Sequence, residues 1–295
     1  MHGRGAALGR TCPTDPASAP PDHGIVFRRT DLVPPVDLPA LAESVNETTM
    51  ASTLCRGDGA ERVRVQTVEH LMSALAGLGI DNLLVEVTAS EIPILDGSAA
   101  SFVYLIQSAG IVEQPALKRF IRVLRPIQVG DDTSGRGSIR TSASSCRSRS
   151  NSAIRPSIPR HSGSRSISAR PLMSARWRGH ALGFISEVEM LRDRGLAKGG
   201  SLGNAIVMDE TRVLNNEGLR SGDEFVKHKI LDAIGDLYVI GAPLLAAYSA
   251  YKSGHALNNE LIRALLADTG AWTWATFHKK RESPRMFIDD WSTAA

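Results

Sequence analysis

The chain has 295 residues, of which 42% are hydrophobic and 22% are charged, and its formal net charge at pH 7 is +3. These values are typical of a soluble globular protein that is long enough for two domains. No apolar run reaches the roughly 20 residues of a membrane-spanning helix, no secretory signal begins the chain, and the cysteines (Cys12, Cys55 and Cys146) show no paired or metal-type spacing, so we expect a cytoplasmic protein.

The positive charge comes from one segment. Residues 131–180 contain ten arginines, no lysine and only two acids, Asp131 and Asp132. The rest of the chain therefore has more acids than bases. For this reason the net charge does not predict binding to nucleic acid.

The first half predicts short strands and two helices. After an apolar stretch at residues 25–29 and a Pro-rich connection, strands are predicted at residues 51–54, 63–65 and 82–87. A helix is predicted from four apolar residues at i, i+3, i+4 and i+7, with Thr67 as its cap and Gly77 or Gly79 at its end: Val68, Leu71, Met72 and Leu75. The loop EIPILDGSAA opens a second helix through residues 102–109, and a domain boundary is expected near residues 113–117.

The second half repeats this order. Strands are predicted at residues 120–124, 205–208 and 244–249, and helices at residues 186–194, from a capping box of Ser221 and Glu224 to about residue 240, and from about residue 260. The chain has no Gly-rich phosphate loop. We therefore predict an α+β fold with domains at residues 1–117 and 118–295, rather than a doubly wound nucleotide-binding fold.

Residues 133–180 are crowded with Ser and Arg and show no apolar period. A low-complexity linker is one interpretation, and translation in a wrong reading frame is the one that we favour. Within codon degeneracy, a two-base displacement from about residue 133 permits a string with alternating apolar positions, aromatic residues and a turn signal. A one-base displacement of residues 2–19 permits TGVGLHSGERARLTLRP, a plausible β-hairpin. We therefore predict that residues 2–20 and 131–182 are frameshifted and irregular.

His228, Asp232 and Asp236 are spaced four residues apart on one predicted helix, so their side chains share one face. An imidazole and a carboxylate at this spacing can share one zinc ion and leave positions for another ligand and for water. The same pattern is common as a solvated His–Asp pair on a helix surface. The spacing alone leaves both interpretations open.

Glu69 and His70 open another helix, where His70 can supply a third zinc ligand and Glu69 can take a proton from water. They can equally be a helix-start acid beside a partly buried histidine. His255, in the loop KSGHALNN, is a candidate general acid that Asp236 could orient in its cationic form. It can equally be a helix-cap or surface histidine.

Four long strings closely resemble the UDP-3-O-acyl-N-acetylglucosamine deacetylase family of Gram-negative bacteria, which acts in lipid A synthesis: TVEHLMSALAGLGIDNL, EIPILDGSAASFVYLIQSAGI, DEFVKHKILDAIGDLYVIG and AYKSGHALNN. The likeness runs through most of residues 24–129 and 183–266. It implies two similar domains, each a β-sheet layered on two helices, with the helices sandwiched between the sheets.

The resemblance also implies a site. It implies one catalytic Zn²⁺ held by His70, His228 and Asp232. Glu69 would be the general base, and His255 the general acid, positioned by Asp236. Lys229 matches a residue that helps to hold the substrate, an acylated UDP-N-acetylglucosamine. An insert at residues 184–208, with Phe184 and Gly200 as substrate-contacting residues, would line an apolar passage for the acyl chain.

The chain departs from the family pattern in two places. The motif R-T-F-G-F, whose Thr helps to stabilise the oxyanion, stands here as HALGF at residues 180–184, and the N-terminal strand with its histidine is missing. We therefore predict that the chain is less stable and less active than its relatives, or inactive.

Three rival hypotheses remain from the sequence. They are a zinc hydrolase of a different amide, a damaged gene product without activity, and a nucleic-acid-binding protein that uses the Arg/Ser segment. The last predicts steeply salt-dependent binding, but Trp177 is the only aromatic residue of that segment available for stacking on single strands. We expect a monomer that binds no nucleic acid.

Overall fold

The computed structural model describes residues 2–8, 19–131, 133, 135–141, 145–149, 181–184, 205–208, 213–215 and 218–278. Within these ranges the chain is a mixed α/β fold. Strands that precede residue 118 pair only with one another, and so do the strands that follow it. No helix among the described residues is long and apolar enough to cross a membrane.

The first half contains a five-stranded sheet and a small three-stranded one. The larger sheet has the order β3-β2-β7-β1-β8, and β7 at its centre runs parallel to both β1 and β2. The strands of this sheet are β1 (His2–Leu8), β2 (Ile25–Arg29), β3 (Val36–Pro39), β7 (Asn82–Val87) and β8 (Ile111–Leu117). The small antiparallel sheet consists of β4 (Val45–Glu47), β5 (Thr53–Arg56) and β6 (Val63–Val65), with short 3-10 turns at Ala42–Ser44 and Gly59–Glu61.

The second half contains three sheets in its described part. A four-stranded sheet has the order β10-β11-β16-β12, a three-stranded one has the order β15-β9-β17, and β13 pairs with β14. The strands are β9 (Arg119–Val123), β10 (Ile127–Asp131), β11 (Gly135–Arg140), β12 (Ser145–Arg149), β13 (Ala181–Phe184), β14 (Ala205–Met208), β15 (Leu244–Leu245), β16 (Ala247–Tyr251) and β17 (Trp272–Thr276).

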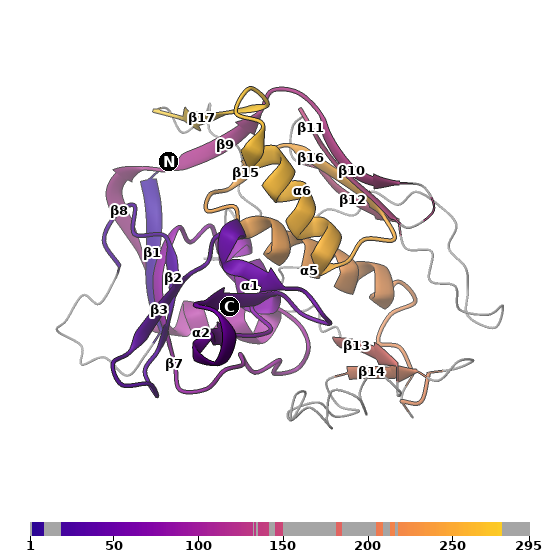
Figure 1. Ribbon diagram of the computed structural model, residues 1–295, viewed down its shortest axis with the longest axis horizontal. Coiled ribbons are helices and arrows are strands. Elements are labelled where there is room, and N and C mark those ends of the chain that lie inside the picture. Colours follow the sequence, from indigo (N-terminus) through magenta and orange to yellow (C-terminus); the bar gives the residue numbers. More distant parts are fainter. Residues whose placement is uncertain are drawn as a thin grey trace.

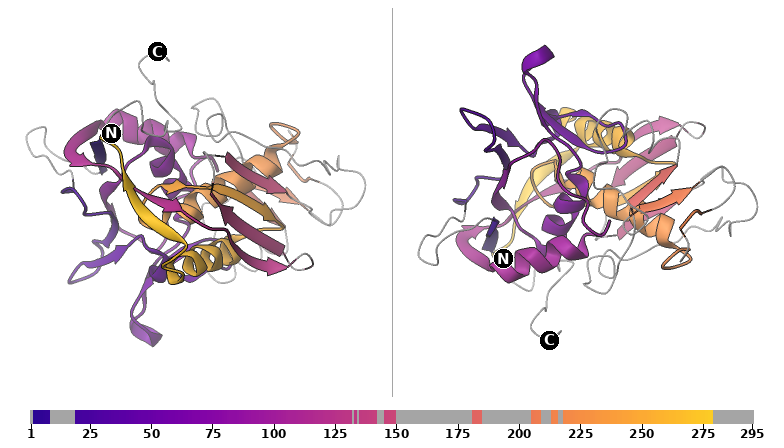
Figure 2. Two further views of the ribbon diagram at one scale, coloured as in Figure 1. Left: turned by 90° about the horizontal axis from the view of Figure 1, so that it is seen from above. Right: turned by 90° about the horizontal axis from the view of Figure 1, so that it is seen from below.

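Four α-helices of the described residues lie between the two large sheets: α1 (Glu69–Leu78), α2 (Ala100–Ala109), α5 (Glu224–Tyr238) and α6 (His255–Ala267). α2 packs on β1 and on α1, α1 packs on α5, and α6 packs on α5, β10 and β11. In Figure 1 the first sheet lies on the left and the four-stranded sheet at the upper right, with the helices between them. Both views of Figure 2 keep the five-stranded and the four-stranded sheet on opposite sides.

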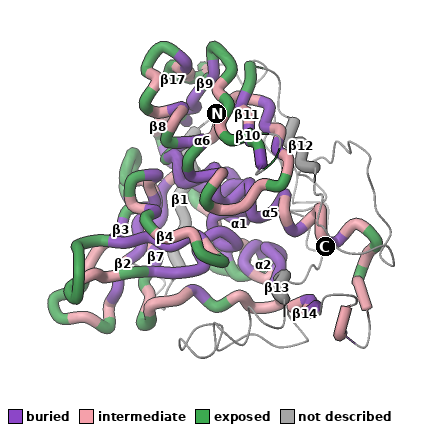
Figure 3. The backbone as a smooth tube through the Cα atoms, turned by 45° about the vertical axis from the view of Figure 1, so that its right-hand side comes forward, coloured by how far each residue is buried: buried purple, intermediate pink, exposed green. Residues whose placement is uncertain are grey.

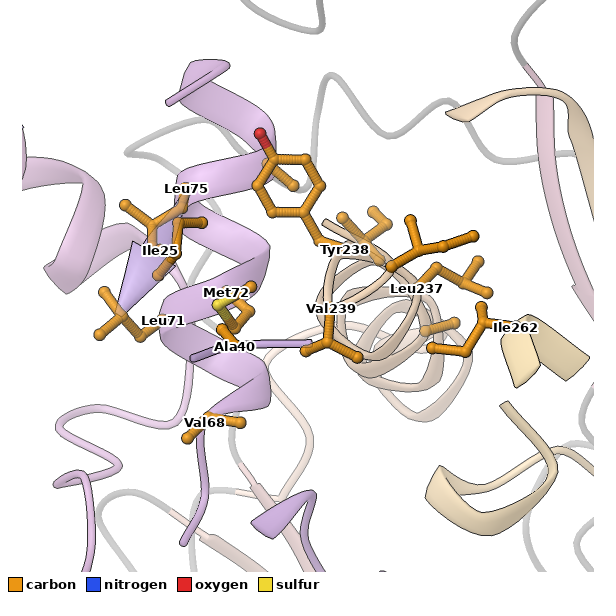
Figure 4. Close-up of a cluster of buried hydrophobic side chains, with 14 of the residues drawn as sticks. Ile25, Ala40, Val68, Leu71, Met72, Leu75, Leu237, Tyr238, Val239 and Ile262 are labelled. Carbon is orange, nitrogen blue, oxygen red and sulfur yellow. The ribbon is translucent and has the colours of Figure 1, made fainter. Parts of the chain in front are cut away.

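The contact between α1 and α5 forms the centre of the core. Every residue of α1 is buried, and so is the second half of α5 (Figure 3). Figure 4 shows Met72 of α1 near Val239, which follows the last residue of α5, Tyr238. The Tyr238 hydroxyl also donates to the Ile80 carbonyl oxygen at 2.8 Å. Since burying one such apolar side chain contributes roughly 1.5–3 kcal/mol, this seam holds the two halves together.

Several predicted elements are confirmed, and four details are wrong. The strands at residues 63–65, 82–87 and 205–208 have the predicted bounds. Thr67 does not cap α1: its φ is +59°, and its hydroxyl donates to Glu91 instead. The Glu224 carboxylate accepts the N–H of Arg220, so Ser221 and Glu224 do not form the predicted capping box. The strand predicted at residues 244–249 is divided between β15 and β16, which belong to different sheets.

The fourth error concerns the last helix, which begins at His255 rather than near residue 260. Asn258 and Asn259 resemble loop residues in the sequence, but both are buried and hydrogen-bonded, to Asp236 and to the Ala42 carbonyl respectively. These tertiary contacts compensate for the weak helix propensity of Asn.

The prediction that residues 2–20 and 131–182 are irregular is wrong for the described parts. β1, β11 and β12 are strands of the two large sheets, and β13 begins at Ala181. In β11 the inward positions are Gly135, Gly137 and Ile139, and Arg136, Ser138 and Arg140 alternate with them. The burial of β11 therefore alternates with a period of two, but two of its three inward positions are glycines. Sheet ladders pair backbone groups, so such a chain can still fill a strand position.

The structure does not test two other expectations. The boundary expected near residues 113–117 falls within β8, which ends at Leu117. The helix predicted at residues 186–194 lies outside the described residues.

Candidate active site

The α1–α5 contact brings His70, His228 and Asp232 together, and we call these three residues the trio. One possible ligand atom from each lies within 4.8 Å of the others. Asp232 Oδ1 is 3.6 Å from His70 Nε2 and 3.4 Å from His228 Nε2, and the two imidazole rings meet edge to face with centroids 5.1 Å apart. All three residues are buried. The two helices therefore converge at the three residues that were expected to share one ion.

The trio fits a tetrahedral zinc ion by two observations. Zinc bonds of roughly 2.0–2.1 Å to N and O place two ligands of one tetrahedral ion about 3.3 Å apart, close to the separations in the trio. In addition, Asp232 Oδ1, the oxygen that lies near both Nε2 atoms, is buried and has no hydrogen-bond partner in the described part of the chain. Because buried polar atoms without partners are costly, a cation that binds the trio would offset this cost.

Burial and mutual charge set the protonation of the trio. Burial alone would raise the pKa of Asp232, but the charges of His228 and His70 outweigh it, and the pKa is lowered. Burial lowers the pKa of His228 to about 4, against the influence of Asp232. For His70, burial is outweighed by Asp232 and Glu69, and the pKa is raised. At neutral pH the Asp232 carboxylate is therefore ionised and His228 is neutral, as zinc ligation requires.

Glu69 lies beside the trio because α1 begins there. Its backbone touches α5 at Gly235, where a Cβ atom would lie 2.0 Å from the Glu69 carbonyl oxygen. Only glycine permits this approach. Two residues earlier, Thr67 has a left-handed φ of +59°, a strained conformation for a β-branched residue. The start of α1 is thus held tightly against α5.

A hydrogen-bonded network lies next to the trio. We define it as Glu69, Ser52, Asp236, His255 and Asn258. His255 Nδ1 lies 2.9 Å from Asp236 Oδ2 and 3.1 Å from Oδ1. Asp236 also accepts the Ser52 hydroxyl at 2.7 Å and the Asn258 amide at 2.8 Å, and the Ser52 backbone N–H donates to Glu69 Oε2 at 3.0 Å. The Asp236–His255 pair expected from the sequence is therefore present.

Two titratable groups of the network, His255 and Glu69, have shifted pKa values. Burial would lower the pKa of His255, but Asp236 outweighs it and raises this pKa to about 10, so the imidazole is cationic at neutral pH. Burial raises the pKa of Glu69, although the charges of His255 and His70 oppose the shift. A cationic proton donor and a carboxylate whose basicity is increased by burial are suited to acid–base work.

The structure describes two of the three residues that were expected to contact the substrate. Lys229 lies on α5 beside His228, and its charge is near enough to lower the pKa of that histidine. Phe184 is the last residue of β13. Gly200 lies outside the described residues.

Sequence reasoning missed Ser52, Gly235 and Asn258. Ser52 precedes β5 and is 184 residues from Asp236 in the chain, so no spacing rule relates them. Gly235 could have been noticed, because a glycine inside an amphipathic helix costs stability unless something packs closely on it. Asn258 lay within a predicted loop, and its contact depends on the true start of α6.

One comparison with known proteins identifies the kind of chain. A family model described as "LpxC: UDP-3-O-acyl N-acetylglycosamine deacetylase" matches residues 1–267. The match covers the trio, the network and all the described helices.

Proposed function

The chain belongs to the UDP-3-O-acyl N-acetylglycosamine deacetylase family, and from this membership we propose that it hydrolyses the acetamide of UDP-3-O-(3-hydroxyacyl)-N-acetylglucosamine, with Zn²⁺ as its cofactor. The products are acetate and a free amine. Membership implies a deacetylase role in lipid A biosynthesis. The observation that carries the zinc dependence is the buried trio, whose separations and unpaired Asp232 oxygen fit this ion.

His70, His228 and Asp232 would hold the metal. Bound there, Zn²⁺ would supply Lewis acidity, which lowers the pKa of water to about 7 and polarises a carbonyl group. The two histidines and one carboxylate leave room for water or substrate in a tetrahedral site. The imidazole of His70 must be neutral to become a ligand, and its pKa is raised, so metal binding depends on pH.

Glu69 and His255 carry the proton transfers in this proposal. Glu69 accepts a proton from the attacking water, whose oxygen forms a bond to the acetamide carbon. His255 donates its proton to the amide nitrogen as the C–N bond breaks, and the amine leaves. Asp236 holds the imidazole cationic and oriented. Positioned groups of this kind each contribute about 10²–10⁴-fold to the rate.

Substrate recognition would involve Lys229, Phe184 and Gly200. Lys229 is next to a proposed zinc ligand on α5, so its ammonium group can meet polar oxygens of the sugar nucleotide. The insert at residues 184–208 would receive the acyl chain. We also propose that the chain works as a monomer with domains at residues 1–117 and 118–295. This is supported by sheets that do not cross residue 118 and by a site built from one chain.

The test compares acetate release from the acylated UDP-sugar with release from UDP-N-acetylglucosamine and from simple N-acetyl sugars. The purified chain is assayed after metal removal and after zinc addition. We expect zinc-dependent release that strongly prefers the acylated substrate. Faster release from a simple N-acetyl sugar would instead identify a hydrolase of a different amide. Release that is unchanged by metal removal would end the zinc proposal.

We propose as a second candidate that the chain is an impaired or inactive product of a frameshifted gene of this family. It is supported by the Arg/Ser composition of residues 133–180 and by Ala181, which stands where the family motif has Thr. Sequencing of the encoding DNA across codons 2–20 and 131–183 would test the frame hypothesis. A cooperative melt with full deacetylase activity would contradict the impairment.

A further inference from the structure

We propose that Ser52 is a positioning residue. It holds the general base, Glu69, at a fixed separation from Asp236, which orients the general acid His255. This inference rests on the proposed function. It assigns a role to a residue that lies outside the trio and that contacts neither zinc nor the reacting atoms.

Ser52 uses all of its polar groups to join α1 and α5. Its backbone N–H donates to Glu69 Oε2 at 3.0 Å, and its carbonyl oxygen accepts the N–H of Val68 at 3.3 Å. Its hydroxyl donates to Asp236 Oδ1 at 2.7 Å. The residue is 2% exposed, so water does not compete for these bonds. A single buried residue therefore fixes the orientation of both carboxylates.

The contact with Asp236 matters because that carboxylate orients His255. Ser52 holds Oδ1 and Asn258 holds Oδ2, so the carboxylate is fixed from two sides while it faces the imidazole. Asn258 is held in turn by the Tyr248 hydroxyl at 2.7 Å. Without the Ser52 hydroxyl, Asp236 Oδ1 would lose a buried hydrogen-bond donor, and the carboxylate group could rotate. His255 would then lose its alignment with the amide nitrogen.

The contact with Glu69 leaves the base ready to accept a proton. Only Oε2 of Glu69 is hydrogen-bonded within the described residues, and its partner is a backbone N–H that cannot turn away. Oε1 is left to meet water. Since alignment errors of about 1 Å can cost on the order of 10²-fold in rate, a residue that fixes both groups should affect turnover without touching substrate.

The experiment measures kcat, KM and zinc content of Ser52→Ala, Ser52→Thr and Ser73→Ala. Ser73 is a matched control, because it is a buried serine of α1 whose hydroxyl has no partner in the described part of the chain. We expect Ser52→Ala to lower kcat by about 10–100-fold, the effect of losing a hydrogen bond to a charged group. KM and zinc content should stay within about twofold, since the variant removes no metal ligand. Ser52→Thr should recover most of kcat, and Ser73→Ala should match the parent.

A double-mutant cycle with Asp236→Ala tests the bridge itself. If Ser52 acts through Asp236, the loss of its hydroxyl changes kcat little when that carboxylate is already gone. If the double variant instead loses kcat by the product of the two single fold-changes, the proposal is overturned. An unchanged kcat in Ser52→Ala would also overturn it.

The same cycle is run on the equilibrium constant of unfolding, which needs no activity. If the parent chain releases no acetate, the proposed function is wrong, whatever the role of Ser52. In that case the unfolding cycle still shows whether Ser52 and Asp236 are coupled. If the two substitutions change the free energy of unfolding independently, the proposed coupling between Ser52 and Asp236 is overturned.

Discussion

Two groups of buried polar side chains lie next to each other between α1, α5 and α6, and they differ in how their hydrogen bonds are met. In the trio, three ligand-type atoms have no partner within the described residues. In the network, the Asp236 carboxylate accepts three donors, and Ser52 uses its N–H, its hydroxyl and its carbonyl group. All three residues of the trio are buried, and so are four residues of the network, while His255 is partly exposed.

This difference separates a site that needs a ligand from one that is complete without it. A buried polar atom without a partner costs roughly 1–3 kcal/mol, so the trio destabilises the fold until a cation binds. The network instead stabilises the fold and fixes its own geometry. Metal binding and acid–base positioning should therefore respond differently to substitution, although the two groups are adjacent on α5.

The largest expected effect is the loss of both groups at once, through Gly235→Ala. The new Cβ would lie 2.0 Å from the Glu69 carbonyl oxygen and 3.0 Å from its Cα, so α1 must move away from α5. Overpacking of this kind costs about 1–3 kcal/mol or more. We expect a lower melting temperature, loss of zinc and loss of acetate release.

Gly222→Ala is the matched control, since nothing lies within 4 Å of a Cβ atom at that position. It should keep the melting temperature, metal content and activity of the parent. Normal zinc binding by Gly235→Ala would show that the close approach of α1 to α5 is not needed to assemble the trio.

The next largest effect is the loss of zinc, which we expect from substitutions in the trio. His228→Ala and Asp232→Ala should lose zinc and nearly all activity, which metal analysis and acetate release would show. Zinc should raise the melting temperature of the parent by several degrees, because a ligand that binds only the folded state stabilises it. The two variants should not respond. A zinc-dependent rise in either variant would place the ion elsewhere.

A smaller loss is expected when the acid–base residues change and the trio stays intact. Glu69→Ala and His255→Ala should lower kcat by about 10²–10⁴-fold while one zinc ion stays bound. The measurement pairs turnover with metal content in the same purified sample. Near-normal turnover would refute the proposed role of the substituted residue, and loss of zinc would mean that the two groups are not independent.

The sequence predicted the trio because it depends on local periodicity. Residues four apart on a helix share a face, so His228, Asp232 and Asp236 could be grouped from their spacing alone. The family resemblance then implied their convergence with His70. Ser52 could not be predicted in this way, because its partner is 184 residues away and no pattern marks a serine before a strand. The strand β11 was missed because glycine was not counted as an inward-facing residue.

The smallest expected effect is on stability as a function of pH. Because its folded pKa is raised from 6.5 to about 10, His255 stabilises the fold fully below about pH 6.5, and this contribution is lost as pH rises through about 10. The free energy of unfolding of the parent minus that of His255→Gln should therefore shrink over this range, by an amount on the order of a few kcal/mol. Denaturant titrations at a series of pH values, on metal-free protein, would measure this difference. His23→Gln, which removes an exposed histidine outside the trio and the network, is the control variant. A difference that stays constant from pH 6 to 10 would mean that the Asp236–His255 contact does not hold the proton, and the contrast between a completed network and an incomplete trio would lose its electrostatic basis.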